Sequence, residues 1–308
     1  MGDGLALRIG ETVEGVGHPS VGYGRVASPT QPDPALSADW LGVCRRAFGR
    51  ITTMLAEHPK TADRARTTGR GEGGDLALVI DRAAEDAILA EVEALGMPVC
   101  AISEERGVVE PNGGGPVRVV VDPIDGSLNA KRRLPLFTVS IAVASGPAMG
   151  DVEFAWVRGA EEWWARRGDG CHLGDERLDP LTGDRGLEIL GIESANPRIV
   201  AASADQLAAT GAHRLRALGS IALSLAYVAA ARFDGMLSLY ASRSVDAAAG
   251  QLLVRELGGA VSFPDAGGDP ANVALDLDMR SRVFAAATPE MLAGLVAAMP
   301  EALPVRPR

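Results

Sequence analysis

Negative charge gathers where one apolar run of the sequence ends. In the stretch VRVVVDPIDGSLN, Asp122 and Asp125 follow five mostly β-branched residues. Carboxylate and carbonyl oxygens are the ligands that Mg²⁺ prefers, and the intervening proline fixes the backbone so that both aspartates and the Ile124 carbonyl could face one point. If a helix begins at Gly126 and Ser127, its free N–H groups favour a phosphate. The stretch therefore predicts a cation site beside an anion site.

Further carboxylates stand at the ends of two other predicted elements. The stretch ISEERG contains Glu104 and Glu105, and SVDAAAGQLL places Asp246 at the start of a predicted helix. Each has a simpler explanation, because adjacent loop glutamates are usually solvated, an aspartate often caps a helix, and Asp-Pro-x-Asp-Gly is a common turn sequence. Taken together, the carboxylates favour a Mg²⁺ site that also binds the phosphate oxygens of a ligand.

The composition limits the classes of protein to which the chain can belong. The 308 residues are 47% hydrophobic and 23% charged, which suffices for one large core or two moderate ones. A net charge of −10 and a pI of about 5.0 argue against a nucleic-acid partner. No apolar run approaches the roughly 18 residues of a membrane span. The three cysteines are far apart, which indicates neither a zinc site nor a disulfide framework and favours the reducing cytoplasm.

The pattern along the chain predicts three regions. Residues 1–35 are rich in Gly, Pro, Ser and Thr, and we expect a flexible N-terminal extension. Residues 36–185 are expected to form an N-terminal α+β subdomain that carries most of the metal ligands. Residues 186–308 are expected to form a C-terminal α/β subdomain that supplies Asp246 and the substrate contacts.

Periodicity within these regions predicts the individual elements. Apolar residues three and four apart indicate a helix over 38–57 and a second over 81–96, each beside short apolar strands. A polar loop is expected near 180–196. The run RIVAAS at 198–203 is interpreted as a strand that precedes a helix from Asp205. Strands that alternate with helices predict an α/β fold.

Several motifs together resemble a known family. The stretches SEE, DPIDGS and VDAAAGQLLVRELGG, in this order, look like the signatures of the inositol monophosphatase and fructose-1,6-bisphosphatase superfamily. The resemblance extends to GDLALVIDRAAED and RLRALGSIALSLAYVAAARFDG, and covers the chain from about Leu36 to its C-terminus. It implies Mg²⁺-dependent, typically lithium-sensitive phosphatases with a layered αβαβα sandwich, commonly homodimers, which act on a small phosphorylated metabolite.

The same resemblance implies a set of site residues. The cofactor would be two or three Mg²⁺ ions, with Mn²⁺ as a substitute, and Glu105 would be a ligand for a weaker additional ion. The metal ligands would be Glu104, Asp122, the Ile124 carbonyl, Asp125 and Asp246. The catalytic residues would be Asp81, Ser127 and Glu104, with Asp81 paired to the Ser127 hydroxyl. The phosphate and substrate contacts would be Gly126, Ser127, Gly219, Ser220, Ala222 and Arg243. Asp75 heads the same motif as Asp81, but an ordinary loop or capping role explains Asp75 equally well.

Some positions depart from the pattern of inositol phosphatases. Leu239 stands where a glutamate contacts inositol hydroxyls, and a leucine cannot accept hydrogen bonds from a polyol. The threonines common near Asp81 are replaced by Leu78 and Ile80. The basic run at 131–133 could contact a second phosphate of a bisphosphate, but a solvated surface loop is the favoured interpretation, because exposed Lys and Arg are common.

The predicted function is hydrolysis of a small sugar or polyol phosphate, such as inositol 1-phosphate, by a metal-activated water. Alternatives on the same site are fructose-1,6-bisphosphatase, histidinol-phosphatase and phosphoadenosine-phosphate phosphatase activity. A catalytically silent, metal-binding member is an alternative of another class. A dinucleotide-binding fold is disfavoured because no Gly-x-Gly-x-x-Gly follows a strand and opens a helix.

Overall fold

The structure is a computed structural model that describes residues 33–70 and 76–300. Most of the expected N-terminal extension, residues 1–32, lies outside the described residues, as does Asp75. The last residues of that expected extension belong to the folded unit. Pro34–Ser37 form a short 3₁₀ helix in which Ala35 is buried, and the Trp40 indole N–H donates to the Ala35 carbonyl oxygen at 2.7 Å.

The larger sheet of the described residues has eight strands in the order β10-β9-β8-β7-β6-β5-β3-β4. Only β3 and β5 pair in parallel, and the other neighbours in this sheet are antiparallel. The strands are β3 (Cys100–Ser103), β4 (Gly107–Val109), β5 (Arg118–Asp125), β6 (Thr138–Ala144), β7 (Val152–Arg158), β8 (Glu162–Arg166), β9 (Gly170–Leu173) and β10 (Glu176–Arg177).

The smaller sheet of the described segments has five strands in the order β12-β11-β13-β15-β14. Its strands are β11 (Ile189–Glu193), β12 (Arg214–Arg216), β13 (Gly235–Ser238), β14 (Ala260–Ser262) and β15 (Phe284–Ala286). Strand β11 pairs in parallel with β12 and β13, whereas β15 is antiparallel to both of its neighbours. A separate two-stranded ribbon joins β1 (Thr67–Arg70) and β2 (Leu76–Leu78).

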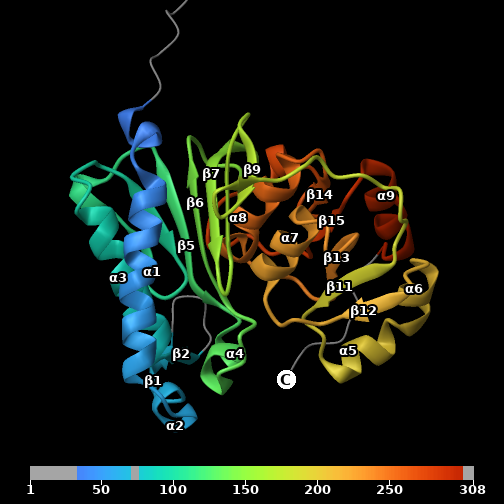
Figure 1. The fold of residues 1–308 in the computed structure, drawn as a ribbon, viewed down its shortest axis with the longest axis horizontal. Helices are drawn as coiled ribbons and strands as arrows, with labels where there is room; N and C mark the ends of the chain where they lie inside the picture. Colours follow the sequence, from blue (N-terminus) through green and yellow to red (C-terminus); the bar gives the residue numbers. More distant parts are fainter. Residues whose placement is uncertain (1–32, 71–75, 301–308) are drawn as a thin grey trace, which may run out of the picture. The chain divides into compact units, whose positions relative to one another are not determined.

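The helices form layers around the two sheets, as Figure 1 shows. The longer helices are α1 (Trp40–Glu57), α3 (Val79–Glu93), α7 (Ile221–Ala229), α8 (Ser244–Arg255) and α9 (Pro289–Ala298), and the short ones are α2 (Thr61–Arg64), α4 (Ser127–Arg132), α5 (Pro197–Ala202) and α6 (Ala204–Ala209). Helices α1 and α3 cover the outer face of the larger sheet, α7 and α8 lie between the sheets, and α5, α6 and α9 cover the smaller sheet. This order of layers confirms the predicted αβαβα sandwich.

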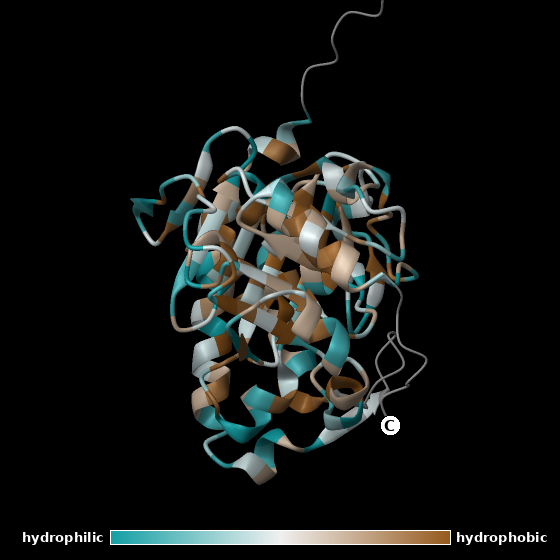
Figure 2. Ribbon diagram, turned by 90° about the vertical axis from the view of Figure 1, so that its right-hand side faces the viewer, coloured by the Kyte–Doolittle hydropathy of each residue, from teal (hydrophilic) through white to brown (hydrophobic). Residues whose placement is uncertain are grey.

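Successive side chains of β5 point to opposite faces of the sheet and so pack into two different cores. Val119 and Val121 point into the apolar core beneath α1 and α3, whereas Val120 points into the core shared with α7 and α8. All three are buried. Figure 2 shows the most hydrophobic ribbon segments concentrated in the inner elements and the hydrophilic ones mainly in the outer loops and helices. No helix of the described residues is both long and apolar enough to cross a membrane.

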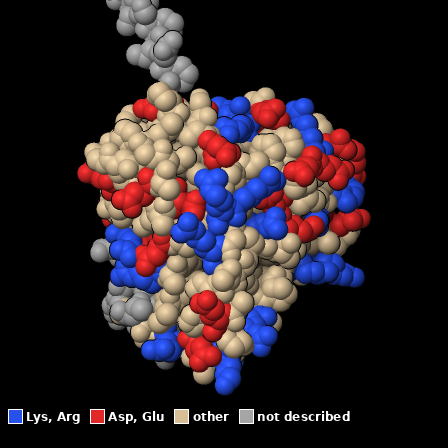
Figure 3. Space-filling model, turned by 60° about the vertical axis from the view of Figure 1, so that its left-hand side comes forward, with Lys and Arg blue, Asp and Glu red and all other residues tan. Residues whose placement is uncertain are grey.

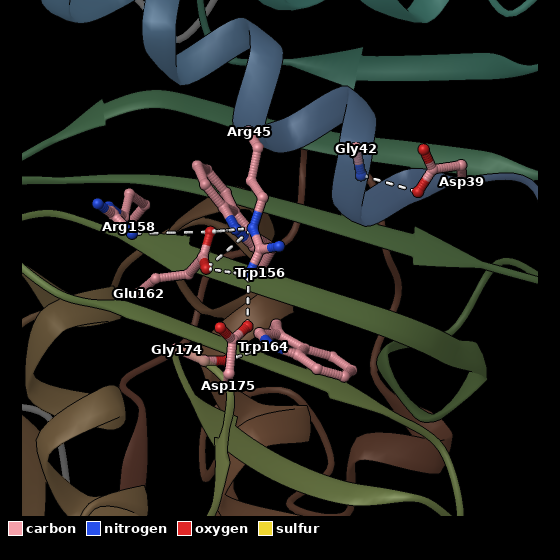
Figure 4. A network of polar contacts seen from close by, with 9 residues as sticks. All are labelled: Asp39, Gly42, Arg45, Trp156, Arg158, Glu162, Trp164, Gly174 and Asp175. Carbon is pink, nitrogen blue, oxygen red and sulfur yellow. Dashed lines mark hydrogen bonds and ion pairs between the residues drawn. The ribbon is translucent and has the colours of Figure 1, made fainter.

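An ion pair between the exposed Arg45 and the buried Glu162 joins α1 to the larger sheet (Figure 4). Glu162 on β8 accepts hydrogen bonds from the Arg45 guanidinium, at 2.7 Å from Nη2, and from the Trp156 indole N–H at 2.9 Å. Burial alone would raise the pKa of Glu162, but the hydrogen bonds from Arg45 and Trp156 outweigh it and hold the pKa below its ordinary value. The carboxylate is therefore buried charged and paired, which fixes the position of α1 on the sheet.

The predicted helices over 38–57 and 81–96 are confirmed as α1 and α3. The prediction for 180–203 is wrong. The strand β11 lies inside the expected polar loop, and the run at 198–203 belongs largely to helix α5. Asn196 caps that helix by accepting the Arg198 N–H at 3.0 Å, and Pro197 occupies the first helical position. These signals make the apolar run helical.

The predicted boundary near residue 185 falls between the two sheets, in the segment between β10 and β11. However, α8 comes from the C-terminal region and packs on β5, β6 and β7 of the larger sheet. The chain from Asp33 onward accordingly forms one compact unit. The division into two subdomains describes the sheets but does not separate their cores.

The close packing of α7 on α8 yields a stability prediction. A Cβ atom built on Gly250 would lie 2.6 Å from Cβ and Cδ1 of the buried Leu225. We expect Gly250→Ala to lower the free energy of unfolding by about 1–3 kcal/mol, because the helices cannot move apart without opening the core. Urea unfolding measures this change.

Gly294 provides the matched control, because it is an exposed glycine of α9 with no atom within 4 Å of an added Cβ. Gly294→Ala should leave the protein as stable or raise its stability by up to about 1 kcal/mol through helix propensity. Equal effects of the two substitutions would contradict the proposed crowding between α7 and α8.

Candidate active site

Most of the predicted site residues line one pocket of about 330 Å³, whereas Asp81 and Ala222 are not part of its lining. It lies where the end of β5, the turn after β3, the end of β11 and the N-terminal ends of α4, α7 and α8 come together. Its lining consists of Glu104, Asp122, Ile124, Asp125, Gly126, Ser127, Glu193, Ser194, Ala195, Gly219, Ser220, Ile221, Arg243 and Asp246. Elements from both sheets contribute, so the pocket exists only in the complete fold.

The end of β5 places two of the predicted ligands. The register of β5 against β6 shifts between Asp122 and Asp125, which turns this segment away from regular pairing. The Asp122 carboxylate accepts the Ile124 N–H at 3.1 Å. This local contact is the turn chemistry that the sequence DPID allows, and it orders the segment that carries both aspartates.

Gly126 allows helix α4 to begin at the pocket. Its φ is +91°, a left-handed conformation that favours glycine, and an added Cβ would lie 2.9 Å from the Gly219 carbonyl oxygen and 3.1 Å from that of Leu136. Helix α4 then starts at Ser127, as predicted. The Ser127 hydroxyl donates to the Ile124 carbonyl oxygen at 3.0 Å.

The start of α7 holds Asp125. The Asp125 Oδ2 atom accepts the Ser220 hydroxyl at 2.7 Å and the Ala222 N–H at 2.6 Å. Ser220 also caps α7 by accepting the Leu223 N–H at 3.2 Å. The predicted substrate residues Ser220 and Ala222 thus contact a carboxylate of the site, while Ile221, which the sequence analysis did not select, lines the pocket.

The start of α8 brings Arg243 and Asp246 into the pocket. The Asp246 carboxylate stands at the third position of α8 and accepts the backbone N–H of Arg243, the N-cap residue, at 2.8 Å. Asp246 is therefore not the N-cap residue that its simpler explanation proposed, although its side chain helps to cap the helix. The Arg243 guanidinium forms an ion pair with Glu104, 139 residues earlier in the sequence. Capping and a role in the site are therefore compatible for Asp246.

The carboxylates of the pocket repel one another. Burial raises the pKa of Asp122 well above its ordinary value, and the nearby charges of Glu104, Asp125 and Asp246 raise it further, while Arg243 lowers it. Burial likewise raises the pKa of Asp125, followed by the charge of Asp246. The site therefore holds more negative charge than its own basic side chain compensates.

This donor set fits a hard divalent cation, because carboxylates and a backbone carbonyl are the ligands that Mg²⁺ takes and a cation would neutralise their excess negative charge. The side chains line the pocket without converging on one point. Within residues 33–70 and 76–300, no three His, Cys, Asp or Glu side chains form a ready group of metal ligands. The assignment of individual ligands accordingly stays a prediction.

Asp81 lies near this cluster in the first turn of α3. Its side chain is buried, its Oδ2 atom accepts the Leu78 N–H at 3.4 Å, and its Oδ1 atom accepts no hydrogen bond from a described residue. Burial, together with the charges of Glu104 and Glu105, raises the pKa of Asp81 to about 8, although the hydrogen bond from the Leu78 N–H and the nearby Ser127 hydroxyl act to lower it. The expected pairing of Asp81 with the Ser127 hydroxyl stays a prediction, because that hydroxyl donates to Ile124.

Two buried glutamates were missed by the sequence analysis. Glu85 on α3 is fully buried, and its Oε1 atom accepts the Ser103 hydroxyl and the N–H groups of Glu105, at 3.2 Å, and Arg106, at 3.0 Å. It therefore holds the turn that carries Glu104. Glu193 ends β11 and lines the pocket. The position of Glu193 at the end of the apolar run ILGIE is the sequence feature that could have identified it.

Other selected positions lie away from the pocket. Leu239 is buried in the apolar core of the smaller sheet, so position 239 offers the pocket no carboxylate. Lys131, Arg132 and Arg133, at the end of α4, are partly or fully exposed and do not line the pocket. Figure 3 shows that basic and acidic side chains are intermixed over one face of the protein. The solvated-loop interpretation of the run at 131–133 agrees with its exposure.

The raised pKa of Asp81 predicts how stability depends on pH without added metal. Between its unfolded value, near 3.8, and its folded value of about 8, the folded protein holds a proton that the unfolded chain releases. Stability should therefore fall as pH rises through this window, by up to about 1.4 kcal/mol per pH unit for this one group. Thermal unfolding in EDTA between pH 5 and pH 8 should show a shallower fall for Asp81→Asn than for the wild type.

Asp205→Asn is the matched control, because Asp205 is an exposed aspartate in the first turn of a helix, α6. It should follow the wild-type dependence on pH. If Asp81→Asn follows it too, Asp81 does not titrate in this range.

Comparison with known proteins agrees with the geometry. A model of the inositol monophosphatase family matches residues 41–303. The fructose-1,6-bisphosphatase/inositol-1-monophosphatase of Methanothermobacter thermautotrophicus is 31% identical over 236 residues, which cover 72% of this chain and 84% of that protein. The Nus factor SuhB of Escherichia coli K12 is 35% identical over 235 residues, with the same two coverages of 72% and 84%.

Solved structures share the fold. The inositol monophosphatase TM1415 of Thermotoga maritima superposes with a TM-score of 0.67 at 23% identity, over 85% of this chain and 98% of that chain. The extragenic suppressor protein SuhB of Bartonella henselae superposes with a TM-score of 0.70 at 24% identity, over 86% of this chain and 100% of that chain. With the family match over most of its length and the pocket described above, the chain belongs to the inositol monophosphatase family and is a phosphatase.

Proposed function

We propose that this phosphatase hydrolyses a small sugar or polyol phosphate, of the kind of inositol 1-phosphate, with Mg²⁺ as cofactor. The observation that supports the proposal most directly is the pocket itself. In it, carboxylates from the turn after β3, from β5 and from α8 adjoin the N-terminal end of α4. Cations bound by these carboxylates would attract a phosphate, whose oxygens the backbone N–H groups at the start of α4 could then bind.

The metal ligands in this proposal are Glu104, Asp122, the Ile124 carbonyl, Asp125 and Asp246, for two or three Mg²⁺ ions, with Mn²⁺ as a substitute. When bound, such ions supply neutralisation of phosphate charge and a water of lowered pKa. The remaining roles belong to the chain itself. The N–H groups of Gly126 and Ser127 would bind the phosphate oxygens, and Arg243, which faces the same pocket, would bind a substrate anion.

Asp81 is the proposed base. Its Oδ1 atom accepts no hydrogen bond from a described residue, and burial, the largest cause, raises its pKa above the ordinary value. A carboxylate with a raised pKa takes a proton from water more readily than an ordinary one. Because Asp81 and Ser127 are close neighbours, a proton could pass from the attacking water to Asp81 directly or through the Ser127 hydroxyl, as the family resemblance implies.

Position 239 bears on the choice of substrate. Leu239 lies in an apolar core and cannot accept hydrogen bonds from the hydroxyls of a polyol. Fructose 1,6-bisphosphate, histidinol phosphate and phosphoadenosine phosphate are therefore alternative substrates for the same site. One relative is itself described as a fructose-1,6-bisphosphatase/inositol-1-monophosphatase. We also propose that the protein is a cytoplasmic homodimer with no nucleic-acid partner. This part of the proposal is supported by the family resemblance and by the acidic composition.

A panel of phosphomonoesters tests the proposal. Phosphate release is measured from inositol 1-phosphate, fructose 1,6-bisphosphate, histidinol phosphate and phosphoadenosine phosphate, with Mg²⁺ and with EDTA. We expect release from a member of the panel in Mg²⁺ and none in EDTA. If the folded protein binds Mg²⁺ but releases phosphate from no member, the silent-member alternative or an untested substrate is favoured.

Substitution of the proposed ligands tests the site. Asp122→Asn and Asp246→Asn each replace a carboxylate by a neutral amide of the same shape, so we expect phosphate release to fall by orders of magnitude while the protein stays folded. Circular dichroism verifies the fold, and the exposed Asp205→Asn is again the control with unchanged activity. Wild-type turnover by both variants would exclude this pocket as the active site.

A further inference from the structure

Glu193 is a buried carboxylate of the pocket that belongs to none of the roles above. It ends β11, where it pairs with Ser238 of β13, and its side chain is 1% exposed. It lines the same pocket as the proposed metal ligands. A buried carboxylate is costly unless hydrogen bonds compensate it, so its partners indicate what it does.

Those partners lie on the turn that precedes α7. The Glu193 Oε2 atom accepts the Gly219 N–H at 2.8 Å, and the Oε1 atom accepts the Leu218 N–H at 3.1 Å and the Ser224 hydroxyl at 2.5 Å. Both carboxylate oxygens are thus directed at this turn and at the first turns of the helix. A side chain that only filled space would not require such partners.

The turn held in this way is constrained on its other side as well. Gly219 has a φ of +79°, and the Asn129 side-chain amide donates to the Leu218 carbonyl oxygen at 2.7 Å. The next residue, Ser220, donates its hydroxyl to Asp125 at 2.7 Å. The turn at 218–220 is therefore hydrogen-bonded to Glu193 at one end and to Asp125 at the other.

We propose that Glu193 is a positioning residue, which fixes the turn at 218–220 and through Ser220 orients the carboxylate of Asp125 for a divalent cation. The inference rests on the proposed function in one respect, namely that Asp125 is a metal ligand. Residues that hold a ligand in place commonly change metal affinity by 10–100-fold when they are substituted. Glu193 acts from a separate strand, and so couples β11 to the ligands carried by β5.

The competing explanation is that Glu193 supports cation binding through its charge alone and not through its hydrogen bonds to the turn. A negative group near Asp125 attracts cations wherever its oxygens point, and the charge of Glu193 contributes to the raised pKa of Asp125. Two substitutions separate the explanations. Glu193→Gln removes the charge and places an N–H₂ group toward backbone N–H donors. Glu193→Asp keeps the charge but shortens the side chain by one methylene, so that it no longer reaches the turn.

Binding of Mn²⁺ to the full-length protein without substrate, measured by calorimetry, provides the test. If Glu193 positions Asp125, Glu193→Gln and Glu193→Asp both weaken Mn²⁺ binding by about 10–100-fold. If Glu193→Asp binds Mn²⁺ as the wild type does, charge explains the effect and the proposal is overturned. Wild-type affinity in both variants overturns it as well. The exposed Asp205→Asn controls for the loss of a remote charge.

A double-mutant cycle with Ser220→Ala tests whether the effect passes through the turn. Because Ser220 is the link from the turn to Asp125, we expect the losses in Mn²⁺ affinity from Ser220→Ala and Glu193→Asp to be non-additive. Fully additive losses would mean that the two residues act independently, which contradicts the proposal. If Glu193→Gln does not fold by circular dichroism, this cycle supplies the decisive comparison.

The test separates this inference from the proposed function. Weakened Mn²⁺ binding by the Glu193 variants in a protein that hydrolyses no phosphomonoester of the panel supports the inference and not the function. Phosphate release by the wild type, with Mn²⁺ affinity unchanged in the Glu193 variants, supports the function and overturns the inference. A wild type that binds no Mn²⁺ overturns both.

Discussion

The mutual repulsion of buried carboxylates is the constraint on which the site depends. Burial, and also the charge of Asp246, raise the pKa of both Asp122 and Asp125, and Asp125 raises that of Asp122 as well. Such an arrangement is unfavourable for folding unless cations or protons neutralise it. The fold must therefore hold these groups in place against their own electrostatics, and it does so with contacts that lie outside the predicted ligand set.

Those contacts follow a common pattern. Two segments that carry proposed ligands are fixed by hydrogen bonds to a neighbouring element. Glu85 holds the turn that carries Glu104, and Ser220 holds Asp125. Arg243 joins the start of α8 to the turn after β3. Buried acids that accept backbone N–H groups are well suited to this task, because two oxygens can fix successive residues of a turn.

Local chemistry explains what could be predicted from the sequence. The stretch DPIDGS contains a turn, two predicted ligands and a helix start within a few residues, and all of these features lie at the pocket. Glu193 could not be selected in the same way, because β11 is a short apolar run inside a polar segment and was interpreted as loop. The ion pair of Arg243 with Glu104 joins residues 139 positions apart, and no local pattern predicts it. The substrate depends on which side chains face the pocket, which only the fold determines.

The position of α8 between the two sheets has a consequence for the lifetime of the folded state. Its N-terminal end carries Asp246 into the pocket, while its body packs on β5, β6 and β7 of the larger sheet. A cation shared by Asp246 and β5 would cross-link segments that must separate when the sandwich comes apart. Bound metal would then slow the opening of the protein as well as serve catalysis, and resistance to proteolysis would rise with occupancy of the site.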